Sequence, residues 1–237
     1  MKKNLLNSLY IIAICAFMIV LTSCINYNKK AMFCIRNNDC DKLAMLIHDD
    51  SIDVADGRLL EYACEQGNIS CIRLLIENGA QITRKCVYTV IDKDDIALMQ
   101  YMMTVQSSNV VEFATSCLGS VKSKEMAYYL LAHGCNPYFP EEEAYYMPLV
   151  TADKIAFKIY LKHVGLNNIR KVHLDNILQQ IFVNDDPQKL EVLISEGLSP
   201  SYKLYNKTLL EYAKEQIPFE TIYLPRAPKC AKLLSEL

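Results

Sequence analysis

The chain has 237 residues, of which 51% are hydrophobic, and its 25 Lys and Arg residues nearly balance 27 Asp and Glu residues. No cluster of basic residues accompanies this balance, so the sequence lacks the electrostatic pattern of a nucleic-acid binder, and we expect no nucleic-acid partner. The length suits one or two compact domains or one elongated array of repeats.

Residues 1–24 have the pattern of an export signal. The chain begins with MKK, residues 9–21 carry no charged or amide side chain, and small residues lead to Cys24. The apolar run is too short for a membrane-spanning helix. The stretch LTSC at residues 21–24 resembles the lipobox of bacterial lipoproteins, in which the signal is cleaved before the Cys and the Cys is acylated. The alternatives are an ordinary N-terminal anchor helix or a signal cleaved elsewhere.

The lipobox resemblance implies a signal peptide at residues 1–23 and a lipidated tether at residues 24–30. Each buried methylene contributes about 0.8 kcal/mol, so several acyl chains on Cys24 would hold the protein on a membrane durably. Ile25 occupies the place where an inner-membrane retention signal normally has Asp. We therefore expect a location in the cell envelope, on the outer membrane facing the periplasm or the surface if the host is Gram-negative.

Residues 56–85 form the most regular stretch of the chain, DGRLLEYACEQGNISCIRLLIENGAQITRK. Its middle resembles the ankyrin repeat, with two departures: one residue is missing before Leu59, and Glu61 stands where the family usually has a His that ties down the loops between repeats. The residues that match the family pattern are Leu60, Ala63, Gly67, Ile72, Leu74, Leu75, Gly79 and Ala80.

The spacing of apolar residues supports two short helices in this stretch. Leu59, Leu60 and Ala63 fall on one helical face, and Gly67 is suited to end that helix in the left-handed conformation. A second apolar stripe follows at Ile69, Ile72, Leu75 and Ile76. Two short helices cannot bury both of their apolar faces alone, so further helix pairs must stack on them.

The pattern of the second helix recurs along the chain with a period near 30 residues. It predicts helices at residues 41–50, 69–78, 95–104, 123–134, 154–163, 188–197 and 229–237. The equivalent inward positions are Leu46, Leu75, Met102, Leu130, Tyr160, Leu193 and Leu233. The predicted fold is all-α: residues 31–237 form an ankyrin-like helical repeat solenoid of about seven degenerate repeats with short loops.

The last repeat contains an insert, IPFETIYLPRAP at residues 217–228, whose three prolines forbid a continuous helix. It is interpreted as a cap over the end of the stack, with a flexible loop as the alternative.

Eight cysteines remain after the signal and Cys24 are set aside. Their spacing shows no CxxC, and no two histidines lie four residues apart, so we expect no zinc site. Cys64, Cys71 and Cys230 fall at inward or partly inward positions, where free Cys acts as a small apolar core residue. Export would also permit disulfides, and Cys64 with Cys71 is the first pair to test.

The sequence offers little support for catalysis. His48, His133, His163 and His173 occur singly, three of them near predicted helix ends, and no nucleophile motif accompanies them. The pairs Asp94/Asp95 and Asp185/Asp186 precede second helices and are expected to begin them, and no calcium-loop spacing surrounds these pairs or the run Glu141–Glu143. We expect a protein that is not an enzyme and has no cofactor or metal.

Tyrosine provides the candidate binding residues, because Tyr combines a large apolar ring with a hydroxyl group. In the ankyrin-like reading, the concave face carries Tyr62, Gln66, Tyr212 and Gln216. The loop tyrosines either contact a partner or pack over neighbouring loops, and they are Tyr138, Tyr145, Tyr146, Tyr202 and Tyr205.

These features together predict a monomeric, membrane-lipid-anchored scaffold that binds another protein, of unknown identity, in the bacterial cell envelope. One alternative is a secreted effector that acts on host proteins through the same repeats. A third possibility, an enzyme, would need polar residues that converge in a pocket, and a deep cavity lined by His and Asp would favour it.

Overall fold

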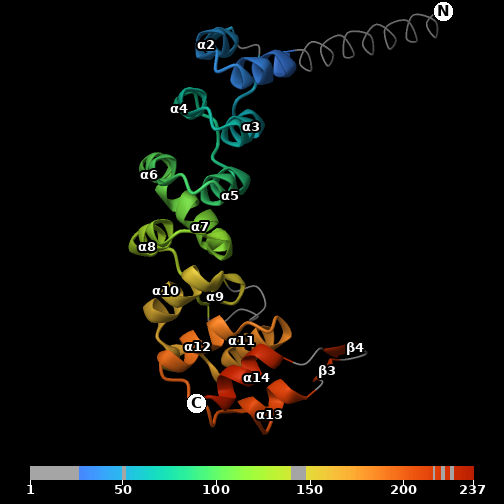
Figure 1. Ribbon diagram of the computed structural model, residues 1–237. Coiled ribbons are helices and arrows are strands. Elements are labelled where there is room, and N and C mark those ends of the chain that lie inside the picture. Colours follow the sequence, from blue (N-terminus) through green and yellow to red (C-terminus); the bar gives the residue numbers. More distant parts are fainter. Residues whose placement is uncertain (1–26, 50–51, 140–147, 216, 220–221, 225–226) are drawn as a thin grey trace, which may run out of the picture. The chain divides into compact units, whose positions relative to one another are not determined.

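The computed structural model describes residues 27–49, 52–139, 148–215, 217–219, 222–224 and 227–237, drawn in colour in Figure 1. The predicted signal peptide, Cys24, Tyr145, Tyr146, Gln216 and the run Glu141–Glu143 lie outside these residues. The described part of the chain is mostly helical, which confirms the all-α class, and it divides into two compact units, residues 1–90 and 91–237.

The first unit is built from short helices. They are a helix at residues 27–36, α2 (Cys40–His48), α3 (Arg58–Gln66), α4 (Ile69–Glu77) and most of α5 (Arg84–Asp92). Helix α4 packs against both α3 and α2. Leu60 and Ile72 are fully buried, so the apolar stripes predicted for α3 and α4 form the core of this unit, except that Ile69, at the start of α4, is 44% exposed.

Two glycines set the ends of α3. Gly67 follows the helix with φ 75°, and its N–H donates to the carbonyl of Ala63 at 2.9 Å, which is the left-handed ending that the sequence predicts. Gly57 precedes the helix with φ 77°. A side chain at Gly57 would begin 2.7 Å from Thr83 Cγ2 and 2.9 Å from the carbonyl oxygen of Gln81, so this close approach requires glycine.

The second unit is also built mainly from helices. Its helices are α6 (Ile96–Val105), α7 (Ser107–Cys117), α8 (Lys124–Ala132), α9 (Pro148–Thr151), α10 (Lys154–Val164), α11 (Lys171–Val183), α12 (Pro187–Ser195), α13 (Leu209–Lys214) and α14 (Pro228–Ser235), with 3-10 turns η1 (Leu118–Ser120) and η3 (Leu166–Asn168). Helix α10 packs against α8 and α12, and α12 packs against α14, so the predicted second helices from α8 to α14 are direct neighbours, while α6 packs against α7.

The seven predicted second helices all form, with ends within two residues of their predicted limits. The burial of five of the seven predicted inward positions is also confirmed. Leu75, Met102, Leu130, Tyr160 and Leu193 are fully buried. The first and last positions in chain order, Leu46 and Leu233, are half-buried.

The aspartate pairs begin helices, as predicted. The carboxylate of Asp95 accepts the N–H of Leu98 at 3.0 Å, and Asp186 caps α12 through two backbone N–H groups. The residue before each cap has positive φ, 58° at Asp94 and 47° at Asp185, a conformation that Asp tolerates better than most residues.

These left-handed residues also connect successive second helices, which the sequence did not predict. The hydroxyl of Ser123, at the start of α8, donates to Asp94 Oδ1 at 2.5 Å. The N–H of Cys230, in the first turn of α14, donates to Asp185 Oδ1 at 3.0 Å. In the first unit, Asn38 (φ 53°) precedes α2, and its Oδ1 lies 3.8 Å from Cys71 Sγ in α4. We call these three contacts the helix-start links.

Two short antiparallel strand pairs lie in the C-terminal part. Strands β1 (Lys203–Leu204) and β2 (Lys207–Thr208) flank Tyr205 and Asn206, which have φ values of 49° and 66° and make the tight turn of a hairpin. Strands β3 (Ile217–Phe219) and β4 (Ile222–Leu224) pair within the proline-containing insert. The insert is therefore not helical, as predicted, but its strand pairing was not foreseen.

Candidate partner-binding surface

The best surface candidate lies on α3. Tyr62 is half-buried and Gln66, one turn later, is exposed. The hydroxyl oxygen of Tyr62 accepts a hydrogen bond of 3.1 Å from Nε of Arg36, which is exposed at the end of the helix at residues 27–36. We call Arg36, Tyr62 and Gln66 the α3 face. Sequence reasoning missed Arg36 because only the packing of the two helices brings it to Tyr62.

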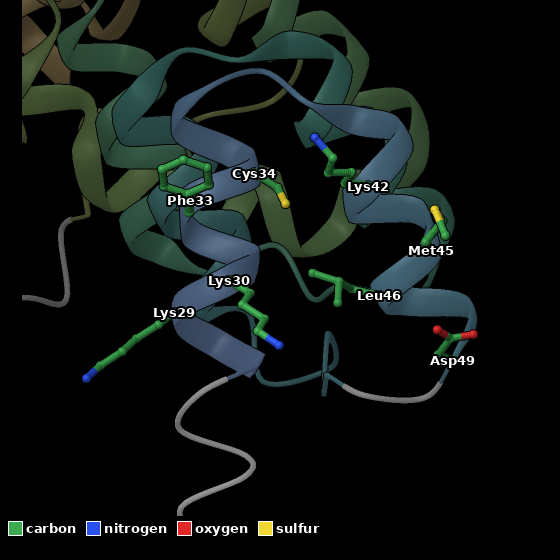
Figure 2. Close-up of a pocket in the computed structure, with 8 residues that line it drawn as sticks. All are labelled: Lys29, Lys30, Phe33, Cys34, Lys42, Met45, Leu46 and Asp49. Atoms are coloured by element: carbon green, nitrogen blue, oxygen red, sulfur yellow. The ribbon is translucent and has the colours of Figure 1, made fainter.

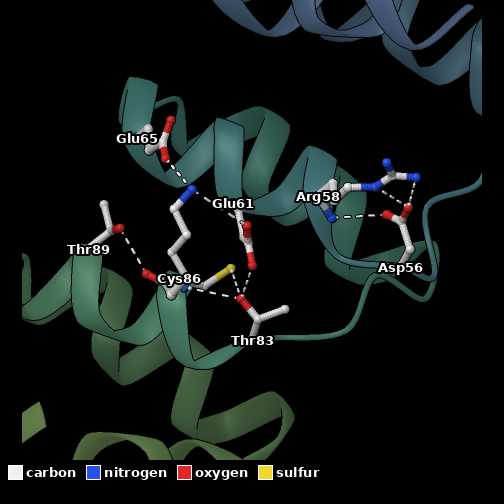
Figure 3. A network of polar contacts seen from close by, with 8 residues as sticks. Asp56, Arg58, Glu61, Glu65, Thr83, Cys86 and Thr89 are labelled. Atoms are coloured by element: carbon white, nitrogen blue, oxygen red, sulfur yellow. Dashed lines mark hydrogen bonds and ion pairs between the residues drawn. The ribbon is translucent and has the colours of Figure 1, made fainter. Parts of the chain in front are cut away.

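Beside this face, a polar network joins α3 to the start of α5 (Figure 3). The hydroxyl of Thr83 donates to Glu61 Oε1 at 2.7 Å and accepts the N–H of Cys86 at 3.3 Å. Nζ of Lys85 lies 2.7 Å from Glu65 Oε1 and 3.7 Å from Glu61 Oε2, and the Glu65 contact raises the pKa of Lys85. Glu61 thus links two successive helix pairs through its carboxylate.

A second ion pair in Figure 3 precedes α3. The guanidinium of Arg58 approaches Asp56 Oδ2 at 2.6 Å through Nε and through Nη2, and the N–H of Arg58 donates to Asp56 Oδ1 at 3.0 Å. The Arg58 side chain is largely exposed, so solvent screens this pair and its main effect is to shape the turn into α3.

The prediction that Tyr212 is presented to a partner is wrong. Tyr212 is only 4% exposed, and its ring centroid lies 5.3 Å from that of Phe182 and 6.1 Å from that of Tyr205. The octapeptide around Tyr212 nearly repeats that around Tyr62, but the β1–β2 hairpin precedes α13 and places Tyr205 beside the ring. The surroundings, and not the local sequence, decide the exposure.

Two of the loop tyrosines pack within the protein. Tyr138 is 6% exposed, and its hydroxyl oxygen accepts the N–H of Arg170 at 2.9 Å and lies 3.0 Å from Nδ1 of His173. Tyr202 donates to Asp175 Oδ1 at 2.6 Å, and burial together with this carboxylate raises the pKa of Tyr202 to about 12. Both fit the alternative interpretation of packing over neighbouring loops.

Tyr205 differs from these two, because its side chain is 56% exposed at the tip of the β1–β2 hairpin. It therefore remains a candidate contact for a partner, although its ring also flanks Tyr212.

The histidines are spread along the helices. His48 is the last residue of α2, His163 lies in the last turn of α10, and His133 is the C-cap of α8, so their predicted helix-end positions are confirmed. His173 is buried in the first turn of α11, and desolvation, followed by the charge of Arg170, lowers its pKa. Across the described ranges, no group of three or more His, Cys, Asp or Glu residues is arranged to hold a metal ion.

A pocket of about 470 Å³ lies between the helix at residues 27–36 and α2 (Figure 2). Phe33 and Met45 line it and are 66% and 65% exposed, which is unusual for large apolar side chains. Lys30 and Lys42 bring ammonium groups to the pocket, Asp49 brings a carboxylate, and the Lys29 side chain extends away from α2. Lys42 is paired with Asp39 at 2.6 Å. The pocket therefore combines apolar surface with charges of both signs at the end of the predicted tether.

A second pocket, of about 320 Å³, lies in the other unit and includes Phe157, Gln180, Asp186 and Lys189 in its lining. Nζ of Lys189 lies 5.5 Å from the centroid of the Phe157 ring, and burial lowers the pKa of Lys189. Asp186 already caps α12. The lining of this pocket brings together the polar residues Gln180, Asp186 and Lys189 and contains no His.

Four cysteines of the first unit form two thiol contacts. The Sγ atoms of Cys40 and Cys71 lie 2.8 Å apart, and the thiol of Cys64 hydrogen-bonds to Cys86. That bond and the Thr83 hydroxyl lower the pKa of Cys86 to about 7 despite burial. All eight described cysteines are free. The sequence put forward Cys64 with Cys71 as the first pair to test, whereas in the structure Cys71 contacts Cys40 and Cys64 contacts Cys86.

Comparison of the chain with models of known protein families gives no match, and comparison with curated proteins gives no match either. None of the helices within the described residues is long and apolar enough to cross a membrane.

Proposed function

We propose that this protein is a lipid-anchored scaffold whose ankyrin-like repeats bind another protein in the bacterial cell envelope. The observation that carries the binding proposal is the α3 face, where Tyr62 is held by Arg36 beside the exposed Gln66. Tyr and Arg are the residue types most favoured as anchors of protein interfaces. The hydrogen bond to Arg36 fixes the Tyr62 side chain before binding, which reduces the entropy lost when a partner docks.

The helix-start links support the repeat architecture in this proposal. They occur at Asn38, Asp94 and Asp185, each immediately before the cap of a second helix, and each reaches the first turn or cap of the following second helix. A contact that recurs at equivalent positions is expected when one structural unit is repeated along the chain. About seven such units, over residues 31–237, form the proposed array.

The anchoring proposal rests on the lipobox-like residues 21–24 and gains support from the pocket of Figure 2. Lys29 and Lys30 lie near the start of the described chain, only a few residues after Cys24, and Lys42, which pairs with Asp39, lies at the same pocket. Each Lys near a membrane surface contributes about 1 kcal/mol of attraction to anionic headgroups. Acylation of Cys24 would therefore bring a positively charged, partly apolar end of the protein to the membrane.

The partner proposal is tested by photo-crosslinking in the native bacterium. A photoreactive amino acid is placed at Gln66 and, as a matched control, at Glu77, which is exposed on the second helix α4. We expect one protein to crosslink at position 66 and not at position 77. Tyr62→Ala should abolish that crosslink. An equal yield from position 77, or a crosslink unchanged by Tyr62→Ala, would contradict the α3 face as the binding surface.

Metabolic labelling with an alkyne fatty acid tests the anchor and separates the alternatives. The wild-type chain should take up label and remain with membranes, whereas Cys24→Ser should do neither. An unlabelled wild-type chain recovered from the medium would favour the secreted effector that acts on host proteins.

A further inference from the structure

The strongest unassigned feature is the contact between Cys40 and Cys71. Cys40 is the first residue of α2 and Cys71 is the third residue of α4, and these two helices pack directly against each other. Their Sγ atoms are 2.8 Å apart, whereas a disulfide bond is about 2.05 Å long, so a movement of about 0.8 Å would bring the sulfurs to bonding distance.

We propose that Cys40 and Cys71 form a disulfide bond that links α2 to α4 when the protein meets an oxidant of the disulfide class. The proposal rests on the proposed location outside the cytoplasm, where such oxidants maintain disulfides. Of the sulfur pairs in the first unit, this one combines contact with access: Cys40 is half-buried, whereas Cys71 is 0% exposed.

The reaction proceeds by two exchanges. The Cys40 thiolate attacks one sulfur of the oxidant's disulfide, forms a mixed disulfide and releases the first thiol. The Cys71 thiolate then attacks Cys40 Sγ and releases the second thiol. Two protein sulfurs are oxidised, the two oxidant sulfurs are reduced, and the two protons of the protein thiols leave on the released thiols.

The surroundings of the two sulfurs fit this order of attack. Burial, and next the contact with Cys40, raise the pKa of Cys71 to about 12, so Cys71 remains a thiol while Cys40 is free. The part of this rise that comes from Cys40 is removed once Cys40 carries a mixed disulfide. The accessible Cys40 is thus the sulfur that meets the oxidant, and Cys71 closes the bond.

Cys64 and Cys86 provide an internal comparison. These thiols also touch, but both are at most 1% exposed, so an oxidant in solution cannot reach either sulfur in the folded protein. The pKa of Cys86 is lowered to about 7, which would favour its reaction if thiolate content alone decided the outcome. The proposal predicts that exposure of a sulfur to the oxidant matters more than its thiolate content. Cys64 and Cys86 should therefore stay reduced.

The test uses the full chain, purified in detergent and incubated with glutathione disulfide, then alkylated, digested with trypsin and analysed by mass spectrometry. We expect peptide 37–42, which holds Cys40, to be linked to peptide 59–73, with fragmentation assigning the bond to Cys71 and not Cys64. Cys40→Ser should abolish the linked peptide, whereas Cys135→Ser, at a buried cysteine of the other unit, should leave it unchanged.

Three results would overturn the proposal: no linked peptide, a bond within peptide 59–73, or preferential linkage of peptides 59–73 and 86–93 through Cys64 and Cys86. Alkylation of intact cells before lysis tests the location separately. If purified protein forms the Cys40–Cys71 bond but the protein in cells is fully reduced, the proposed location is wrong and the pairing stands.

Discussion

The carboxylate of Asp185 accepts the N–H of Cys230, 45 residues further along the chain, at 3.0 Å, and it also accepts the N–H of Lys229. Asp185 immediately precedes the cap of α12, and the two donors lie in the first turn of α14, where a helix presents N–H groups without partners inside the helix. One side chain therefore connects the starts of two neighbouring second helices.

Asp185→Ala should destabilise the protein by about 1–2 kcal/mol, because it removes a charged acceptor from two N–H groups at a helix start. Urea unfolding monitored by circular dichroism measures the change. Asp185→Asn keeps an acceptor oxygen and should therefore lose less stability than Asp185→Ala. Asp185→Gly relaxes the left-handed backbone but removes the acceptor, so a Gly variant that is more stable than wild type by the full cost of a left-handed non-glycine residue, about 1–2 kcal/mol, would show that the link contributes nothing.

The two LLEYA segments provide a matched pair of tyrosines. Tyr212→Ala should cost about 3–5 kcal/mol, because it empties a buried aromatic site beside Phe182. Tyr62→Ala should cost far less in stability and yet remove the crosslink to the proposed partner, since Tyr62 is half-buried on the α3 face. Equal losses of stability in the two variants would contradict the difference in burial.

The bond between Glu61 and Thr83 is best measured by a double-mutant cycle with Glu61→Gln and Thr83→Val. We expect a coupling of about 0.5–1.5 kcal/mol, the usual net range for a hydrogen bond in a protein, because Gln keeps an acceptor oxygen and only the charge of Glu61 is removed. Glu65→Gln serves as the control with Thr83→Val, because Glu65 pairs with Lys85 and not with Thr83. If the coupling energy between Glu65 and Thr83 is as large as that between Glu61 and Thr83, the coupling is carried by Lys85 and not by the direct hydrogen bond.

Acidification should destabilise the second unit through His173. The pKa of His173 is lowered in the folded protein, so the unfolded chain binds more protons as pH falls through the His range. The stability contributed by neutral His173 is complete above its unfolded pKa and is lost as pH falls through the folded pKa. Thermal unfolding between pH 7.5 and 5.5 should show this loss in wild type and a smaller one in His173→Leu.

Oxidation should stabilise the first unit if Cys40 and Cys71 form the proposed disulfide. The bond would close a loop between residues 31 positions apart, and chain-entropy estimates for loops of such length give about 3–4 kcal/mol. Denaturant unfolding of protein treated with glutathione disulfide, compared with reduced protein, measures this gain. Cys40→Ser should unfold at the same denaturant concentration under both conditions.

The helices and their inward faces were predictable because they depend on local spacing. Leu75, Met102 and Leu193 are buried where the period of about 30 residues places them. Asp95 and Asp186 cap helices because an Asx residue before an apolar run does so in most settings. These features need no knowledge of which helix pairs are neighbours.

The site was less predictable because exposure and pairing depend on packing between distant segments. Glu61 and Glu211 occupy the same place in the two octapeptides, yet Glu211 forms a capping box with Thr208 while Glu61 reaches Thr83 beyond its own helix pair. Cys71 likewise contacts Cys40 because α4 packs on α2, although Cys64 is nearer to Cys71 in the sequence. Octapeptide similarity carries none of this information.

The helix-start links join residues separated by very different lengths of chain: 29 residues from Asp94 to Ser123, but 45 from Asp185 to Cys230. The longer interval holds the β1–β2 hairpin, α13 and the β3–β4 strand pair, and the link still forms. At these helix starts, one side chain connects neighbouring second helices whatever the length of chain between them. Such an arrangement lets new segments be inserted between second helices, by evolution or by design, while the contacts that align those helices are retained.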